Sequence, residues 1–412
     1  MVTNWLRWSW RDLRRHWAAV VSIAAVVAIG TGVFAGFGSS SAWRRMSNDA
    51  SFAALRMHDI RLTLSPGTFT AEGDLVELVD EALGDDIAVV TERLLVPTQV
   101  DASGAAGTVL VSGRIIGTTL GASSGGTSVD DVWVVDGSAP APGSADVLLE
   151  HKFAAYYDLP PTGTIRIAGG AAVPYSGTGI GPEEFYVVGE RSSVLAEADF
   201  ASLYTDLSTA QMLSGRPDVV NDVVVVLAAG ADRDAAVRML EDGLADRAGI
   251  AATVEVRDDT EAYRILYSDI DSDQQVWNLL SGLVLLAAAL ASFNLIGRIV
   301  EAQRREIGIG MALGAPRRML AIRPVLIGVQ VAVLGTLGGL GAGAYIGSLM
   351  RGLLESIVPM PIYVTPFQFD VFARGAIVGF LPPIVASIIP VWRALRVEPI
   401  TAIRTGHLAA TT

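Results

Sequence analysis

Few residues in this chain have the types and spacing that catalysis requires. The 412 residues include no cysteine, which excludes disulfides, thiolate catalysis and cysteine–zinc sites. The one lysine, Lys152, lies in LLEHKFAAYY, which lacks the glycines that precede the lysine of a P-loop. No HExxH or GxSxG motif occurs, and the four histidines are too scattered for a metal cluster: His16, His58, His151 and His407. We therefore expect no catalytic, cofactor-binding or metal site in this chain.

Two other features could hold a ligand, and for both the plainer interpretation is favoured. Gly177–Gly181 (GTGIG) is rich in glycine, but Pro182 follows it instead of the helix that a phosphate site needs, so we expect a flexible loop. Adjacent acids could bind calcium or act in catalysis, but such pairs are more often solvated surface. We expect solvated surface at Asp130–Asp131, Glu183–Glu184 and Asp258–Asp259.

The most distinctive pattern of charged and small residues is Glu301–Pro324 (EAQRREIGIGMALGAPRRMLAIRP). It predicts a helix that continues from the preceding apolar segment and stops around Leu313–Ala315. Gly314 permits the chain to reverse, and Pro316 suits the first turn of a new helix. The result is a short, basic, amphipathic elbow that projects from the membrane. A loop whose arginines only fix membrane orientation is the alternative.

Four apolar segments must position this elbow. They are residues 17–42, 276–297, 324–350 and 371–392, each about the 20 residues or more that cross a bilayer core. The first could instead be a cleaved signal peptide, although its apolar stretch is longer than usual for one. The fourth carries the only charged residue within these segments, Arg374, and three prolines that weaken a helix unless neighbours satisfy the backbone: Pro382, Pro383 and Pro390.

The arginines orient the four predicted helices. By the positive-inside rule, residues 1–16, the loop 298–323 and the tail 393–412 lie in the cytoplasm. Residues 43–275 and the short loop 351–370 then lie outside. From Gly38 to Gln275 the chain has 15 basic and 37 acidic residues, and this acidic balance argues against nucleic acid. The orienting arginines are Arg7, Arg11, Arg14, Arg15, Arg298, Arg304, Arg305, Arg317, Arg318, Arg323, Arg393, Arg396 and Arg404.

The inserted residues 43–275 predict an α+β domain. The spacing of apolar residues predicts a helix over Ala71–Leu83, and a short strand is expected over Phe185–Val188. The clearest unit is strand, helix, strand: Val219–Leu227, Asp232–Arg247 and Ala252–Val256. Residues 42–57 and 260–275 look helical and could extend the first two membrane helices as a stalk. The predicted fold is a membrane protein with one plus three transmembrane helices and a large α+β extracytoplasmic domain between helices 1 and 2.

Glycines recur at every fourth position in the third membrane segment and twice in the first. This spacing makes a smooth helix face on which another backbone can approach closely, although the pattern does not identify the partner helix. The residues are Gly335, Gly339, Gly343 and Gly347, with Gly32 and Gly36.

The elbow and the end of the chain resemble the FtsX-like permease family, the MacB/LolC/LolE class of ABC transporter subunits. The family run is of the type R-R-x-E-I-G-x-x-x-A-x-G-A, and the spacer before the glutamate is absent here. The family tail is similar to P-x-x-R-A-…-P-x-x-A-L-R, with Ile403 in place of the usual leucine. The matching residues are Arg304, Arg305, Glu306, Ile307, Gly308, Ala312, Gly314, Ala315, Pro316, Arg317 and Arg318, then Pro390, Arg393, Ala394, Pro399, Ala402 and Arg404.

The resemblance implies a permease subunit of an ATP-driven transporter in a bacterial plasma membrane. A separate cytoplasmic ATPase, which carries ATP and Mg, would dock around Ile307–Met319, and a second permease subunit would complete a homodimer or heterodimer. ATP-driven motion would pass by mechanotransmission to the outer domain, which would handle a lipid, lipoprotein, peptide or drug in contact with membrane lipid. The alternative is a signalling subunit that regulates a cell-wall hydrolase or senses antimicrobial peptides. A third alternative, a membrane-anchored enzyme, is supported by no sequence motif.

Overall fold

The computed structural model describes residues 2–104, 107–120, 128–141, 143–186, 188–189, 192–195, 199–247 and 251–396, in two compact units. The helical unit contains Met1–Arg45, Ile270–Ile357 and Thr365–Thr412. The head unit contains Met46–Asp269 and Val358–Val364. The chain therefore passes between the units four times, twice within continuous helices.

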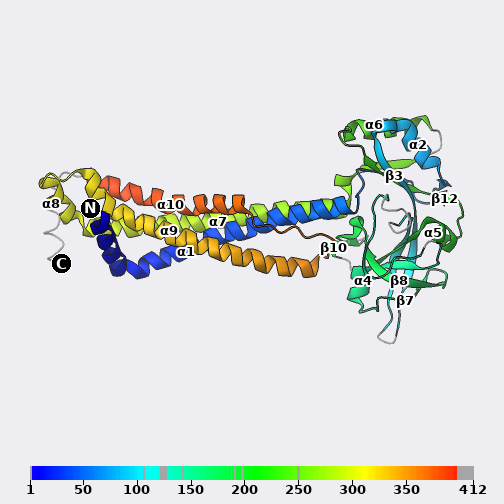
Figure 1. Ribbon diagram of the computed structural model, residues 1–412, viewed down its shortest axis with the longest axis horizontal. Coiled ribbons are helices and arrows are strands. Elements are labelled where there is room, and N and C mark those ends of the chain that lie inside the picture. The colour runs from blue at the N-terminus through cyan, green and yellow to red at the C-terminus, as the bar shows by residue number, and fades with distance from the viewer. Residues whose placement is uncertain are drawn as a thin grey trace. The chain divides into compact units, whose positions relative to one another are not determined.

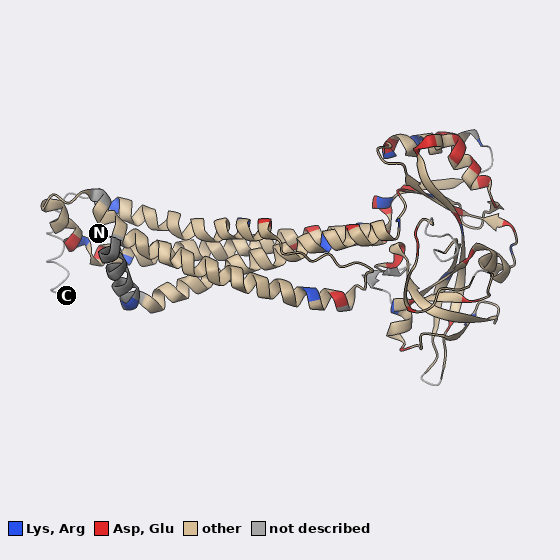
Figure 2. Ribbon diagram, in the orientation of Figure 1, with Lys and Arg blue, Asp and Glu red and all other residues tan. Residues whose placement is uncertain are grey.

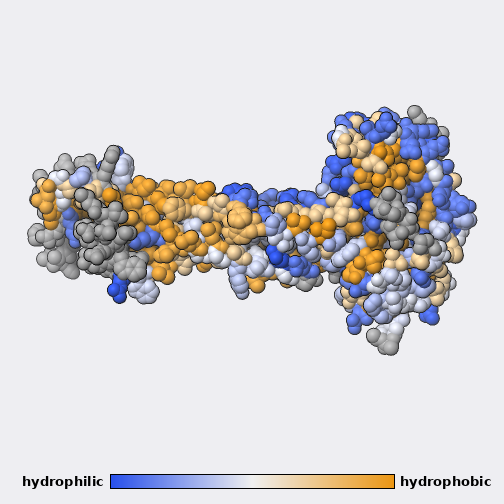
Figure 3. Space-filling model, viewed as in Figure 1, coloured by the Kyte–Doolittle hydropathy of each residue, from blue (hydrophilic) through white to orange (hydrophobic). Residues whose placement is uncertain are grey.

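Among the described residues, four helices are long and apolar enough to cross a membrane, and each contains one predicted segment (Figure 1). Their central stretches carry no charged residue and are predominantly apolar (Figures 2 and 3). The prediction of one plus three membrane helices with an α+β domain between the first two is thus confirmed. The helices are α1 (Val2–Ala54), α7 (Glu261–Ala302), α9 (Arg317–Ile357) and α10 (Phe369–Leu395).

Helices α1 and α7 continue well beyond their apolar segments. Helix α1 stays helical to Ala54, and α7 begins at Glu261, so the expected helical extensions of both segments are confirmed. Helix α10 remains continuous through its three prolines, as membrane helices can when neighbouring groups compensate for the missing hydrogen bonds.

In the described part of the head, ten strands form one sheet with the order β14-β1-β13-β3-β4-β11-β6-β8-β5, and β7 pairs with β3 and β8. The strands are β1 (Ile60–Leu64), β3 (Ile87–Asp101), β4 (Leu110–Thr118), β5 (Trp133–Gly137), β6 (Val147–Glu150), β7 (Gly163–Ile167), β8 (Ala172–Ile180), β11 (Phe200–Asp206), β13 (Asp222–Leu227) and β14 (Ala252–Val256). Two further sheets have two strands each. One consists of β2 (Thr70–Ala71) and β12 (Val219–Val220), and the other consists of β9 (Val188–Gly189) and β10 (Ser192–Leu195). The head helices are α2 (Asp74–Leu83), α4 (His151–Tyr156), α5 (Leu207–Ser214) and α6 (Arg233–Asp246).

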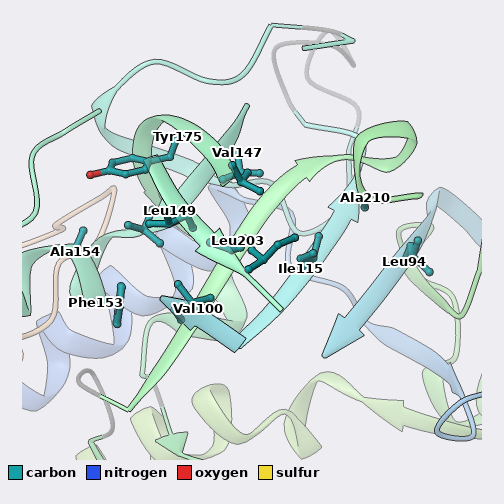
Figure 4. Close-up of a cluster of buried hydrophobic side chains, with 14 residues drawn as sticks. Leu94, Val100, Ile115, Val147, Leu149, Phe153, Ala154, Tyr175, Leu203 and Ala210 are labelled. Carbon is teal, nitrogen blue, oxygen red and sulfur yellow. The ribbon is translucent and has the colours of Figure 1, made fainter. Parts of the chain in front are cut away.

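The strand β3 links two hydrophobic cores. Its residues 87–93 pair with β13, in the core that α2 and α6 cover, and its residues 94–101 pair with β4, in the second core. Figure 4 shows the second core, to which β3 contributes Leu94 and Val100 beside Ile115 of β4 and Leu203 of β11. At 15 residues, β3 is longer than most strands, which allows one strand to belong to both cores.

The predicted strand–helix–strand unit is present as β13, α6 and β14, but its two strands do not pair with each other. The strand β1 lies between them and is antiparallel to both. The unit is therefore a split βαβ arrangement, and its middle strand comes from the other end of the domain sequence.

Two local predictions were wrong. Gly177–Gly181 is not a flexible loop, because β8 runs through Ile180 and pairs with β5. A Cβ atom on Gly177 would lie 2.6 Å from the carbonyl oxygen of Asp136, so glycine permits this close approach of two strands. Phe185 is not in a strand either, because it follows the 3-10 helix Pro182–Glu184 and packs fully buried in the core.

Candidate functional site

The elbow (Arg304–Arg318) folds as a short helix, a tight turn and the start of a long helix. The sequence predicted that the helix of the second apolar segment continues into the elbow. Instead, α7 ends at Ala302, and a separate helix, α8 (Arg304–Ala312), begins after Gln303. Gly314 has a φ of 82°, a left-handed conformation that glycine adopts without strain. Its amide donates to the carbonyl of Met311 (3.1 Å), and the amide of Ala315 donates to that of Gly310 (2.9 Å). These two bonds form a Schellman motif, which closes the helix end.

One face of α8 packs on the other helices. Ile307 is buried in a cluster with Ile296 of α7 and Val391 of α10, and Leu320 of α9 packs against it. A Cβ atom on Gly310 would lie 2.9 Å from Leu320 Cδ2, so the turn between α8 and α9 is tight. The elbow therefore has a fixed position within the helical unit.

The other face of the elbow is apolar and exposed. Leu313, at the tip of the turn beside Gly314, has a relative exposure of 82%. Ile309 of the elbow is exposed as well, and so are Met319 and Ile322 in the turns of α9 that follow it. Exposed apolar groups of this kind on a rigid turn can fill a pocket on a partner protein.

Several arginines of the elbow lie at helix starts, where positive charge does not stabilise a helix. Arg305 lies in the first turn of α8, and Arg317 and Arg318 lie in the first turn of α9, where the helix dipole disfavours positive charge. Glu306, also in the first turn of α8, is exposed and lies where the dipole favours an acid. Pro316 accepts at its carbonyl from the amide of Met319 (2.9 Å) and so begins α9. The positions of these three arginines in the chain therefore do not help to stabilise α8 or α9.

The elbow motif and the first part of the C-terminal tail motif lie close together in the structure. Pro390, Arg393 and Ala394 lie in α10, and Val391 between them packs in the same cluster as Ile307 of the elbow. Pro399 and Arg404 lie outside the described residues.

The six glycines predicted to pack between helices lie on one seam between α1 and α9. A Cβ atom on Gly339 would lie 2.5 Å from Thr31 Cβ, and one on Gly335 would lie 2.5 Å from Val27 Cβ. In the other direction, Gly32 and Gly36 of α1 face residues of α9: a Cβ on Gly32 would lie 3.1 Å from the carbonyl oxygen of Gly339, and one on Gly36 would lie 3.0 Å from that of Gly343. Gly343 and Gly347 of α9 face Gly36 and Ser39 of α1 in turn. The sequence did not identify the helix that packs against the glycines of the third membrane segment. The structure shows that this helix is α1.

The head contains a buried ion cluster that the sequence did not predict. Arg93 on β3 donates to Asp222 (2.6 Å), Asp130 (2.9 Å) and Glu183 (3.0 Å), and Arg61 on β1 donates to Asp222 (2.7 Å). Burial raises the pKa of Asp222, but the guanidinium groups of Arg61 and Arg93 outweigh it and hold that pKa below its usual value. The same balance holds the pKa of Glu183 well below its usual value.

This cluster corrects the prediction of solvated acidic pairs. Asp130, Glu183 and Glu184 are buried, and only Asp258–Asp259 behaves as expected, because the side chain of Asp258 is exposed. One ligand atom each from His58, Asp130 and Glu183 lie within 4.8 Å of one another, a spacing that could hold a metal. Arg93 already binds both carboxylates, however, so the arrangement fits an ion-pair network.

The cluster also joins the ends of α1 and α7. His58, four residues after α1, contacts Asp130 through Nδ1 (2.8 Å) and Thr260, just before α7, through Nε2 (3.1 Å). Arg257 donates to the carbonyls of Met57 (2.8 Å) and His58 (2.9 Å). The chain leaving α1 and the chain entering α7 are thus bonded to each other and to the centre of the sheet.

A cleft of about 1060 Å³ lies beside the cluster in the head. Arg61, Arg114 and Glu184 contribute to its polar side. Three aromatic residues also line it: Phe69, Tyr186 and Phe200. A cleft of this size, lined by both aromatic and charged side chains, is large enough for a ligand or a peptide segment.

The elbow and the apolar segments of the last three membrane helices lie in a region of the chain that matches a known family. Residues 278–399 match the family model described as FtsX-like permease C-terminal, which confirms the resemblance over the elbow and the first part of the tail motif.

Curated relatives point to the same class. The chain is 26% identical over 210 residues to the macrolide export ATP-binding/permease protein MacB of Syntrophobacter fumaroxidans, which covers 49% of this chain and 28% of that protein. It is 27% identical over 125 residues to the uncharacterized ABC transporter permease YknZ of Bacillus subtilis (30% of each chain). It is 25% identical over 166 residues to the lipoprotein-releasing system transmembrane protein LolC of Xylella fastidiosa, 36% of this chain and 39% of that one. The matches thus span well under half the length of these relatives.

Two solved structures resemble part of the chain. The periplasmic region of MacB from Actinobacillus actinomycetemcomitans aligns with a TM-score of 0.34 and 10% identity, over 53% of this chain and 95% of that one. The extracellular domain of YknZ aligns with a TM-score of 0.30 and 14% identity, over 47% of this chain and 98% of that one.

Proposed function

We propose that this chain is the permease subunit of an ATP-driven ABC transporter in a bacterial plasma membrane, with both termini in the cytoplasm and the head outside. The observation that carries the proposal is the elbow: a rigid turn with an exposed apolar tip, inside the region that matches the FtsX-like permease model. The arginine distribution around the four apolar segments supports the orientation.

The ATPase of this system is a separate cytoplasmic subunit that binds ATP and Mg. The sequence of this chain has no P-loop, and its elbow offers Leu313 as an apolar tip beside several arginines. A second permease subunit, identical or related, completes the membrane assembly.

The work done by ATP hydrolysis reaches the head mechanically. Helices α1 and α7 run unbroken from the apolar segments to the head residues, and those segments contain almost no charge, which disfavours a wide aqueous pathway. The head then handles a lipid, lipoprotein, peptide or drug at the outer face of the membrane, and the cleft beside the ion cluster offers space for such a ligand.

Purification of the tagged chain from its native membrane in mild detergent, followed by mass spectrometry, tests the proposal. We expect a P-loop ATPase in stoichiometric amount. Leu313→Asp should reduce its recovery at least tenfold, whereas Met212→Asp, at a largely exposed apolar residue of the head, should not. Recovery of the wild-type chain without any ATPase under several mild conditions would contradict the proposal, and a bound cell-wall hydrolase would favour the signalling role.

A further inference from the structure

The segment between α9 and α10 belongs to the head unit. It was expected to be part of a short outer loop, residues 351–370, but Val358–Val364 (the strap) group with the head residues and not with the helices on either side. Met360 is buried in a hydrophobic cluster with Phe52 and Phe185, and Val358 and Tyr363 pack against this cluster. A plain surface connection would leave its apolar residues and its backbone in water.

Two serines on α1 hold the backbone of the strap. Ser51 Oγ donates to the carbonyl of Ile362 (3.0 Å) and accepts from the amide of the same residue (3.3 Å). One helical turn earlier, Ser47 Oγ accepts from the amide of Val364 (3.0 Å). Residues 362 and 364 lie on the same side of an extended chain, so two hydroxyls at i and i+4 match two alternate residues.

These contacts are partly buried, and the serines that α1 contributes to them are shielded from solvent. Ser47 and Ser51 are almost completely buried, and Tyr363 donates through its hydroxyl to the carbonyl of Val358. Buried backbone groups need partners, and here α1 supplies them in the way that a neighbouring strand would. The strap is thus fixed to the same cluster that contains Phe52 of α1 and Leu266 of α7.

The strap is also connected to the elbow through a single helix, α9. Helix α9 begins at Arg317, within the elbow, and runs without interruption for 41 residues to Ile357, next to the strap. At 1.5 Å per residue, it is a strut of roughly 60 Å. The helix thus connects the elbow to the first residue of the strap by one continuous segment.

We propose that the strap is a force-bearing tether, which makes α9 a third mechanical link between the elbow and the head beside α1 and α7. Ser47, Ser51 and Met360 are its positioning residues. This inference rests on the proposed function, because it requires an ATPase that moves the elbow. It adds that the head responds to the α9–α10 pair as well as to the two helices that enter it directly.

A lengthened tether separates mechanical linkage from packing. Insertion of Gly-Ser-Gly between Ile357 and Val358 leaves every strap contact in place but makes the link slack, because such residues form a flexible chain. The matched control places the same insertion between Gly169 and Gly170, in the exposed turn between β7 and β8. A second variant, Ser47→Ala/Ser51→Ala, releases the strap, with Ser268→Ala on α7 as its control.

Hydrogen exchange followed by mass spectrometry is measured on the complex with its ATPase, without nucleotide and with ATP and vanadate. We expect the wild type and both controls to change protection at residues 46–57 and 257–266. In the slack variant this change should fall at least threefold, although the strap stays protected and the ATPase stays bound. The double serine variant should show the same fall, but with loss of protection in the strap.

The outcomes are separable. A slack variant with a wild-type response overturns the tether and leaves the proposed function standing. A wild-type complex with no nucleotide response in the head overturns the proposed mechanical function, and the tether with it. If the double serine variant fails to fold, the slack variant, whose packing is unchanged, decides.

Discussion

Glu150 gives the sharpest test of how this head is built. Its side chain is 1% exposed, and its two carboxylate oxygens accept from the amides of Lys152 (2.9 Å) and Phe153 (2.6 Å), as the N-cap of α4. Burial raises the pKa of Glu150 from its usual value near 4.5 to about 7, against the opposing effect of these two hydrogen bonds. The folded head therefore holds a proton that the unfolded chain releases between pH 4.5 and pH 7.

The sign and size of the effect follow by linkage. In that window the folded state binds more protons than the unfolded state, so stability falls as pH rises. The loss is complete above pH 7 and amounts to about 3 kcal/mol, since each unit of pKa difference corresponds to about 1.4 kcal/mol. Glu150→Gln removes the titration but replaces one capping acceptor by an amide NH₂, at about 1 kcal/mol. The variant should thus be slightly less stable than wild type below about pH 5, where little of the loss has occurred, and more stable, by about 2 kcal/mol, at pH 8.5.

Pulse proteolysis of the detergent-solubilised chain in a urea series measures this crossover through the head fragments. The control is Glu241→Gln, at an exposed carboxylate on α6, which should leave the pH dependence of the free energy of unfolding unchanged. If the difference between wild type and Glu150→Gln is the same at pH 5 and pH 8.5, the argument from burial is refuted.

Three further outcomes are expected. Gly339→Leu should lower the Tm of the solubilised protein, since an added Cβ would lie 2.5 Å from Thr31 Cβ and overpacking costs about 1–3 kcal/mol; Gly341→Leu, which faces open space on the same helix, should not. Arg93→Met should lower the free energy of unfolding of the head by about 3–5 kcal/mol in the urea assay, because it leaves buried carboxylates underpaired, whereas Arg238→Met on the surface of α6 should change it by less than about 0.5 kcal/mol. Gly314→Pro and Glu306→Arg should uncouple ATP hydrolysis from head movement without unfolding the head, whereas Glu355→Arg, near the other end of α9, should not; normal coupling in the first two would disprove the elbow assignment.

The features that the sequence predicted well depend on neighbouring residues. Length and apolar composition suffice to define the four membrane helices. The turn at Gly314 and Pro316 follows from the conformations that these two residues allow. The glycines of α9 follow a fixed helical period, so their common face was predictable, although their partner α1 was not.

The features that the sequence did not predict depend on distant partners. Asp130 and Glu183 looked like solvated acids because nothing near them in sequence reveals Arg93, which lies on a different strand. The strap contains no helix or strand, so its place in a connection was predictable, but its packing against Phe52 and Phe185 depends on residues far away in the sequence. Its run of apolar residues, VPMPIYV, was the one available signal, since a loop in water seldom needs so many.

The strap also sets an order of events during synthesis. Most of the head lies before Ile270, yet Met360 and its neighbours are translated only after α7, α8 and α9 have been made. Until then, Phe52 and Phe185 lack one of their packing partners, and the hydroxyls of Ser47 and Ser51 lack theirs. The head therefore completes its fold only when the third apolar helix has left the ribosome, which links maturation of this domain to membrane insertion of the chain that follows it.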